Sequence, residues 1–149
     1  MTKRPKNTPT AEPVFISVEV LVKGDMEKVW KCWNEPEHIT QWYQASADWH
    51  APRATNDLNV GGKFMTRMEA KDGSFGFDFE GTYTQVKLHE VISYILADRR
   101  TVDTLFKPQE DGIMITQTFM AETQNTPELQ KFGWQSILNS FQSYVESLG

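Results

Sequence analysis

Thiols, clustered basic residues and long apolar runs are all scarce in this chain of 149 residues. Cys32 is the only cysteine, so the chain can form no intramolecular disulfide and has no paired thiols for a zinc site. The net charge is −5 and the one basic cluster, Lys3, Arg4 and Lys6, is short, which argues against a nucleic-acid partner. No apolar run reaches the length of a membrane span, and the polar start lacks the apolar core of a signal peptide. We therefore expect a cytoplasmic protein.

Motifs for metal binding and catalysis are also missing. His38, His50 and His89 do not have the spacing of metal ligands. The Gly61 and Gly62 pair lacks the lysine and the strand-to-helix context of a phosphate-binding loop. We expect no metal and no cofactor, and no residue is assigned a catalytic role.

Aromatic residues, in contrast, are abundant. The chain has five tryptophans, nine phenylalanines and four tyrosines, and Trp30, Trp33 and Trp42 lie close together in the sequence. Large rings fill hydrophobic cores, but they also line apolar pockets. The composition leaves both interpretations open.

The longest periodic pattern, at residues 126–148, predicts a helix that buries one broad face. Thr126 is placed to cap it, and Pro127 suits a first helical turn. At helical spacing the apolar stripe consists of Trp134, Leu138, Phe141, Val145 and Leu148. The other side is predicted to be the more solvated one and carries Lys131, Gln135, Asn139, Gln142 and Glu146.

The remaining patterns predict short strands and two short helices. Alternating apolar and polar residues predict strands at residues 14–22, 47–53, 64–70, 75–86, 90–96, 99–106 and 113–121, with Pro108 closing the sixth. Helices are expected at residues 28–33, capped by Asp25, and at residues 35–42. Residues 1–13 are expected to be a disordered tail, and residues 14–149 a single domain of the α+β class with an antiparallel sheet.

Five stretches of this sequence resemble one known family. They are VWKCWNEPEHITQWY (29–43), NDLNVGGKF (56–64), FEGTYTQV (79–86), EVISYIL (90–96) and FGWQSILNSFQSYVESL (132–148). In order and spacing they are similar to the activator of heat-shock-protein-90 ATPase homologues, in the START-like or SRPBCC superfamily. The resemblance implies a helix-grip fold, as in birch-pollen-type allergens. In that fold a curved antiparallel sheet of about seven strands wraps a long C-terminal helix, and two short helices follow the first strand.

The resemblance also implies a function. START-like proteins hold lipids, sterols, polyketides or other hydrophobic ligands in a deep cavity between the sheet and the long helix, and some are cyclases or aromatases. The eukaryotic co-chaperone of the family carries this fold as its second domain, after a chaperone-binding domain. No such domain is expected here, so chaperone interaction is an alternative partner and direct chaperone activation is not expected.

Our main hypothesis is that the protein binds a hydrophobic, lipid-like or aromatic small molecule without covalent chemistry, as a monomer or homodimer. Strand alternation places polar Thr66, Tyr83, Tyr94 and Gln117 on apolar faces, where they could orient a ligand. The other predicted ligand-binding residues are Trp30, Trp33, Trp42, Phe64, Met68, Phe77, Phe79, Phe119, Trp134, Leu138 and Phe141.

Two alternatives remain. A cyclase-type enzyme would have a titratable group with a shifted pKa in the cavity. A protein-interaction module would have a filled cavity and an exposed apolar patch.

Overall fold

A computed structural model describes residues 12–149 of the chain. A tail was predicted for residues 1–13. Residues 1–11 of it lie outside the described residues. In chain order the elements are β1 (Phe15–Val22), α1 (Met26–Asn34), α2 (Pro36–Trp42), β2 (Trp49–Asn56), β3 (Lys63–Ala70), β4 (Gly76–Lys87), β5 (Val91–Leu96), β6 (Thr101–Gln109), β7 (Gly112–Met120) and α3 (Pro127–Ser147).

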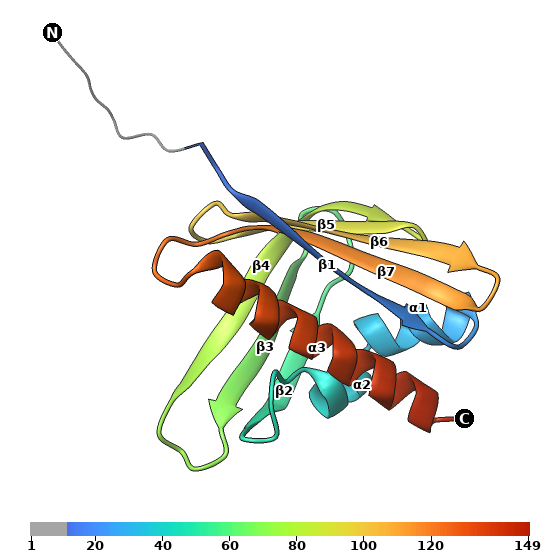
Figure 1. Cartoon of the computed structure of the whole chain (residues 1–149), viewed down its shortest axis with the longest axis horizontal. Coiled ribbons are helices and arrows are strands. Elements are labelled where there is room, and N and C mark those ends of the chain that lie inside the picture. Colours follow the sequence, from blue (N-terminus) through green and yellow to red (C-terminus); the bar gives the residue numbers. More distant parts are fainter. Residues whose placement is uncertain (1–11) are drawn as a thin grey trace, which may run out of the picture.

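The seven strands form one antiparallel sheet in the order β1-β7-β6-β5-β4-β3-β2. The sheet curls around α3, and α1 and α2 close one end of the curl (Figure 1). The predicted α+β helix-grip fold is therefore confirmed. None of the described helices is long and apolar enough to cross a membrane.

The caps and alternating patterns explain most element boundaries. The Asp25 carboxylate accepts a hydrogen bond from the backbone N–H of Lys28 (2.8 Å), and the Thr126 hydroxyl accepts one from the N–H of Leu129 (3.1 Å). Each satisfies an amide that the first helical turn leaves unpaired. In β1 every second side chain is buried. The concave face of the sheet is therefore apolar, and α3 covers it.

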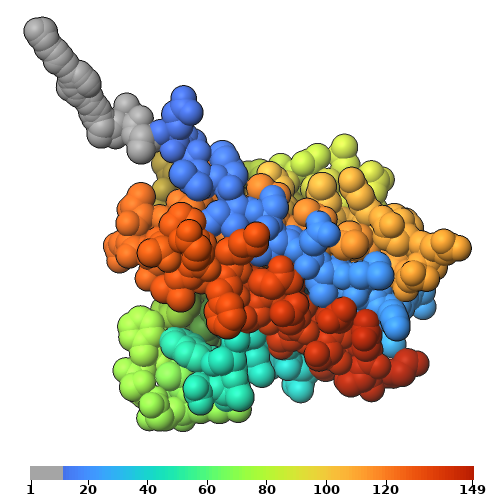
Figure 2. Space-filling view, viewed as in Figure 1, coloured from blue at the N-terminus to red at the C-terminus, as the bar shows by residue number. Residues whose placement is uncertain are grey.

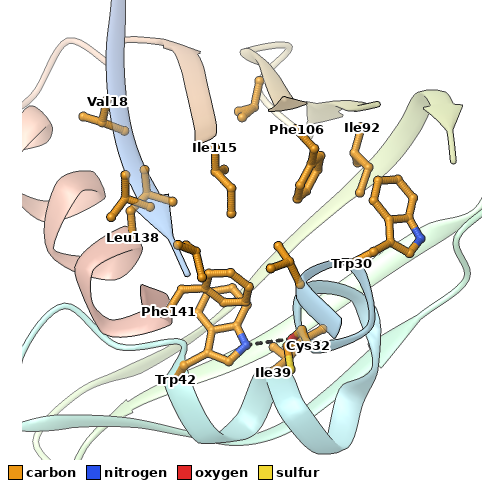
Figure 3. Close-up of a cluster of buried hydrophobic side chains, with 14 of the residues drawn as sticks. Val18, Trp30, Cys32, Ile39, Trp42, Ile92, Phe106, Ile115, Leu138 and Phe141 are labelled. Carbon is orange, nitrogen blue, oxygen red and sulfur yellow. Dashed lines mark hydrogen bonds between the residues drawn. The ribbon is translucent and has the colours of Figure 1, made fainter. Parts of the chain in front are cut away.

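The core lies where α3 meets the sheet and the two short helices. Leu138 and Phe141 of α3 are fully buried and point toward Ile115 of β7 and Trp42 of α2 (Figure 3). The Trp42 indole N–H donates to the carbonyl oxygen of Cys32 at 2.9 Å, so this ring is both packed and hydrogen-bonded.

Pro108 was predicted to close the sixth strand, and this is wrong, since β6 continues to Gln109. The Phe106 N–H donates to the Glu90 oxygen, toward the side on which β5 lies. Alternation turns the Pro108 nitrogen to the same side, but β5 begins only at Val91, and Pro108 has no pairing partner in that strand. A proline is tolerated in a strand where no ladder hydrogen bond is needed from its nitrogen.

The polar side of α3 is the more exposed side, as predicted, but two of its glutamines also bond to a strand. The side-chain amides of Gln135 and Gln142 donate to the carbonyl oxygens of Glu19 and Leu21 in β1, at 2.9 and 2.7 Å. Strand β1 is an edge of the sheet, so these oxygens have no neighbouring strand. Periodicity showed which residues are polar, but only the curl of the sheet brings the edge strand beside them.

We expect Gln142→Ala to lower the free energy of unfolding by about 1 kcal/mol, because the Leu21 carbonyl loses its donor. Lys131→Ala, on an exposed position of the same helix, is the matched control and should change it little. Urea unfolding followed by circular dichroism measures both. Equal midpoints for the two variants would contradict this role of the glutamine.

Candidate functional site

Two apolar hollows lie beneath the N-terminal half of α3. The first, here called the interior cavity, has a volume of about 50 Å³ and is lined by Trp33, Asn34, Ile39, Trp42, Tyr43, Asn56, Phe64, Tyr83, Ile92, Tyr94, Gln117, Trp134 and Ile137. The second, the mouth groove, has about 300 Å³ and is lined by Tyr43, Ala45, Met68, Phe77, Phe79, Asn125, Leu129, Gln130, Gly133, Trp134 and Ile137. They share Tyr43, Trp134 and Ile137, which form the wall between them.

The interior cavity is much smaller than the deep cavity that the resemblance implies. About 50 Å³ holds a few water molecules, whereas sites for drug-sized ligands measure roughly 300–1,000 Å³. Aromatic rings fill the rest: the centroids of Trp33 and Trp42 are 5.1 Å apart, and each lies within 5.0 Å of Phe141. Much of the space between sheet and helix is therefore packed core.

The mouth groove is open to solvent. In Figure 2 it lies between the orange N-terminal half of α3 and the green β3–β4 end of the sheet. Phe77 and Leu129 on its rim are 39% and 58% exposed, so the rim presents apolar surface to solvent. At its inner wall, Trp134 stacks on Phe119 with ring centroids 4.1 Å apart. This contact holds the indole of Trp134 in place between groove and cavity.

A polar cluster of Asn34, Asn56 and Tyr83 lines the interior cavity. The three residues come from the last positions of α1 and β2 and from the middle of β4. The Tyr83 hydroxyl donates to Oδ1 of Asn56, and Nδ2 of Asn56 donates to the backbone oxygen of Asn34 at 2.7 Å. Nδ2 of Asn34 donates to the Trp30 oxygen at 2.9 Å, while the buried Oδ1 of Asn34 has no hydrogen-bond partner in the part of the chain that is described.

Three tyrosines of the cavity are shifted toward their neutral form. Burial raises the pKa of Tyr43, Tyr83 and Tyr94, and a neighbouring tyrosine raises the pKa of Tyr43 and Tyr94 further. All three pKa values thus move away from neutral pH. The hydroxyls can form hydrogen bonds with a ligand, but they are poorly suited to exchanging protons with it at neutral pH.

Ten of the predicted ligand-binding residues line at least one of the two hollows. Those of the interior cavity are Trp33, Trp42, Phe64, Tyr83, Tyr94, Gln117 and Trp134, and those of the mouth groove are Met68, Phe77, Phe79 and again Trp134.

The other five predicted residues, Trp30, Thr66, Phe119, Leu138 and Phe141, line neither hollow. Trp30 packs against Phe106 and His89, and the rest are buried. Alternation and helical spacing indicate which side chains are buried, but they do not tell packed core from cavity wall.

Several lining residues were not predicted. They are Asn34, Ile39, Tyr43, Ala45, Asn56, Ile92, Asn125, Leu129, Gln130, Gly133 and Ile137. Asn56 was assigned to a loop because β2 was expected to end at residue 53, whereas it runs to Asn56. No sequence signal marks Asn34 as part of a pocket, because its role depends on α1 ending beside β2.

Comparison with known proteins identifies a family. The family described as "Activator of Hsp90 ATPase homolog 1-like protein" matches residues 23–146. The solution structure of an AHSA1-like protein from Aeromonas hydrophila is 45% identical, with 91% of this chain and 94% of that chain covered and a TM-score of 0.86. A protein from Cytophaga hutchinsonii is 50% identical over 91% and 92% of the two chains, with a TM-score of 0.75.

A crystal structure from Nitrosomonas europaea is only 18% identical but covers 91% of this chain and 96% of its own, with a TM-score of 0.77. At that identity the likeness shows the fold alone. No curated protein matches the chain.

We expect Tyr43, Tyr83 and Tyr94 to resist ionisation while the protein is folded. Because their folded pKa values are raised, the stability that they contribute is complete below about pH 10, the unfolded value, and is lost as the pH rises toward the folded values. Tyrosinate absorbance should therefore rise at the same pH at which the protein unfolds. Tryptophan fluorescence measures the unfolding. In concentrated urea the same groups should titrate near pH 10. Titration of all four tyrosines at that pH in the folded protein would contradict the burial.

Proposed function

The chain belongs to the family of Activator of Hsp90 ATPase homolog 1-like proteins, and we propose that it binds a hydrophobic small molecule in the mouth groove and the adjoining interior cavity, without covalent chemistry of its own. The observation that carries the proposal is the open apolar groove of about 300 Å³. It shares Tyr43, Trp134 and Ile137 with the interior cavity, which has a polar cluster in its lining.

The size and lining of the groove support binding of a compact ligand. Its volume lies at the lower end of the range for small-molecule sites, and the adjoining cavity can take one tip of the ligand. Burial of apolar surface would supply affinity at about 25 cal/mol per Å² before the cost of ordering the ligand is subtracted. Since the two described linings contain no Asp, Glu, His, Lys or Arg, they offer binding contacts rather than acid-base groups.

A second candidate is a protein-interaction surface at the same place. It is favoured by the small volume of the interior cavity and by exposed apolar side chains at and near the groove. Phe75, Leu129 and Phe132 are 61%, 58% and 71% exposed. Phe75 lies beside the groove residue Phe77, with ring centroids 6.0 Å apart.

Gly133 offers a test that leaves the fold intact. It lines the groove from α3, and a Cβ added there would meet no atom within 4 Å. Gly133→Leu should fill the groove and weaken binding of phenylnaphthylamine, a neutral fluorescent probe, by about tenfold or more, corresponding to about 1.4 kcal/mol. Gly133→Ala is the control. It should keep the probe and raise the free energy of unfolding by up to about 1 kcal/mol, since alanine favours a helix over glycine. Equal probe affinity in the two variants would place the site elsewhere.

Native mass spectrometry of the protein purified from its own host distinguishes the two candidates. The wild-type chain and Gly133→Ala should carry extra mass that is lost on denaturation, and Gly133→Leu should carry less of it. A clean mass for all three, with no probe binding by the wild type, would contradict small-molecule binding and favour the protein-interaction surface.

A further inference from the structure

We infer that the protein forms a homodimer in which the free edge of strand β1 pairs with the same edge of a second copy, antiparallel and centred on Ile16. The two sheets of seven strands then join into one continuous sheet. No residue of the described strand β1 lines either hollow, so this contact is separate from the proposed binding site. Three properties of the edge support the pairing: which backbone groups point outward, which of them α3 occupies, and which residues stand opposite in a second copy.

Alternate residues of β1 direct their backbone groups toward β7 and away from it. The Val14 oxygen accepts a hydrogen bond from the Ala121 N–H (2.8 Å), and the register with β7 continues without a shift, so the even-numbered residues bond to β7. The odd-numbered residues therefore point their N–H and C=O groups outward at the edge. The bonds from α3 agree with this direction, because their partners in and just after β1 are Glu19, Leu21 and Lys23.

Side chains of α3 occupy only the second half of this edge. Besides the two glutamine amides, the Glu146 carboxylate accepts a bond from the Lys23 N–H at 2.9 Å, so the occupied stretch runs from Glu19 to Lys23. In the first half, the outward N–H and C=O groups of Phe15 and Ser17 have no hydrogen-bond partner among residues 12–149. Both residues are exposed. An open strand edge of this kind is a template for pairing with another strand.

A second copy of β1 matches the open groups in this register. With Ile16 opposite the partner's Ile16, Phe15 stands opposite the partner's Ser17, and the two residues exchange both of their outward hydrogen bonds. Pro13 stands opposite the partner's Glu19, where only one bond is needed, since proline has no N–H and the Glu19 oxygen is already bonded to α3. The Glu19 N–H is free to donate to the Pro13 oxygen. A strand without proline at that position would bring an N–H to an oxygen that α3 already occupies.

The side chains at this edge also favour pairing. Val14 and Phe15 are 53% and 52% exposed, so both leave apolar surface in water. In the proposed register the two Phe15 rings are diagonal neighbours across the contact, within reach of each other. Glu19 stands opposite a proline, so no two like charges are directly opposed. Because the paired stretch is short, we expect a weak and reversible dimer with a Kd on the order of 0.1 mM.

Sedimentation equilibrium and NMR spectra of the wild-type chain at increasing concentration test the pairing. Between about 20 µM and about 1 mM the mass should rise from that of a monomer toward that of a dimer. The amide signals of Phe15, Ser17 and Glu19 should shift over the same range, whereas those of Val18 and Val20, which bond to β7, should shift less. A monomer mass at every concentration would overturn the inference. So would a dimer in which the amides of Phe15 and Ser17 do not respond, since that dimer uses another surface.

Ser17→Pro removes an outward N–H from the edge and keeps the ladder to β7, since a proline is tolerated where its nitrogen faces solvent. It should remain a monomer at about 1 mM, with the circular dichroism spectrum of the wild type. Ser17→Ala keeps the N–H and is the matched control, so it should dimerise like the wild type. If Ser17→Pro does not fold, Phe15→Lys changes only an exposed side chain, brings two positive charges together across the contact and should raise the Kd about tenfold. A folded Ser17→Pro chain, or a Phe15→Lys chain, that dimerises as the wild type does would contradict the pairing.

Discussion

The packing of α3 against the concave face of the sheet is the contact on which the rest of the structure depends. The two halves of the helix are covered differently. Its C-terminal half also packs on the short helices: Phe141 contacts Trp42, and the Ser140 hydroxyl donates to the Trp42 carbonyl at 2.7 Å. Its N-terminal half covers the two hollows, which Trp134 and Ile137 help to line, whereas Leu138, Phe141 and Val145 in the other half are fully buried.

The aromatic residues both fill the interior of the protein and form the walls of the groove. Rings such as Trp33 and Trp42 fill the space that a START-like fold can leave open, so the interior cavity is small. Rings such as Phe77 and Trp134 form the walls of the groove that remains. The same burial that fills the interior also keeps the tyrosine hydroxyls neutral. Their contribution to a ligand is thus limited to hydrogen bonds and shape.

The sequence predicted the strands and helices well because their signals are local. Asp25 and Thr126 cap helices through bonds to amides three residues away, and alternation in β1 and β7 reports one buried face. The sequence did not reveal hydrogen bonds whose two partners come from distant segments. Gln142 looked solvated because nothing near it in the sequence indicates that the carbonyl of Leu21 lies within reach.

By itself the sequence determined the fold class, the order of the elements, the inner faces of the strands and most of the aromatic residues that face inward. These follow from backbone propensity and from hydrophobic periodicity, which act over a few residues. The tertiary structure alone decided which of those rings are core and which are wall, because that depends on how distant side chains fill a shared volume. It also decided the polar end of the site. Asn34, Asn56 and Tyr83 meet only when α1, β2 and β4 come together, and their hydrogen bonds exist only at that contact.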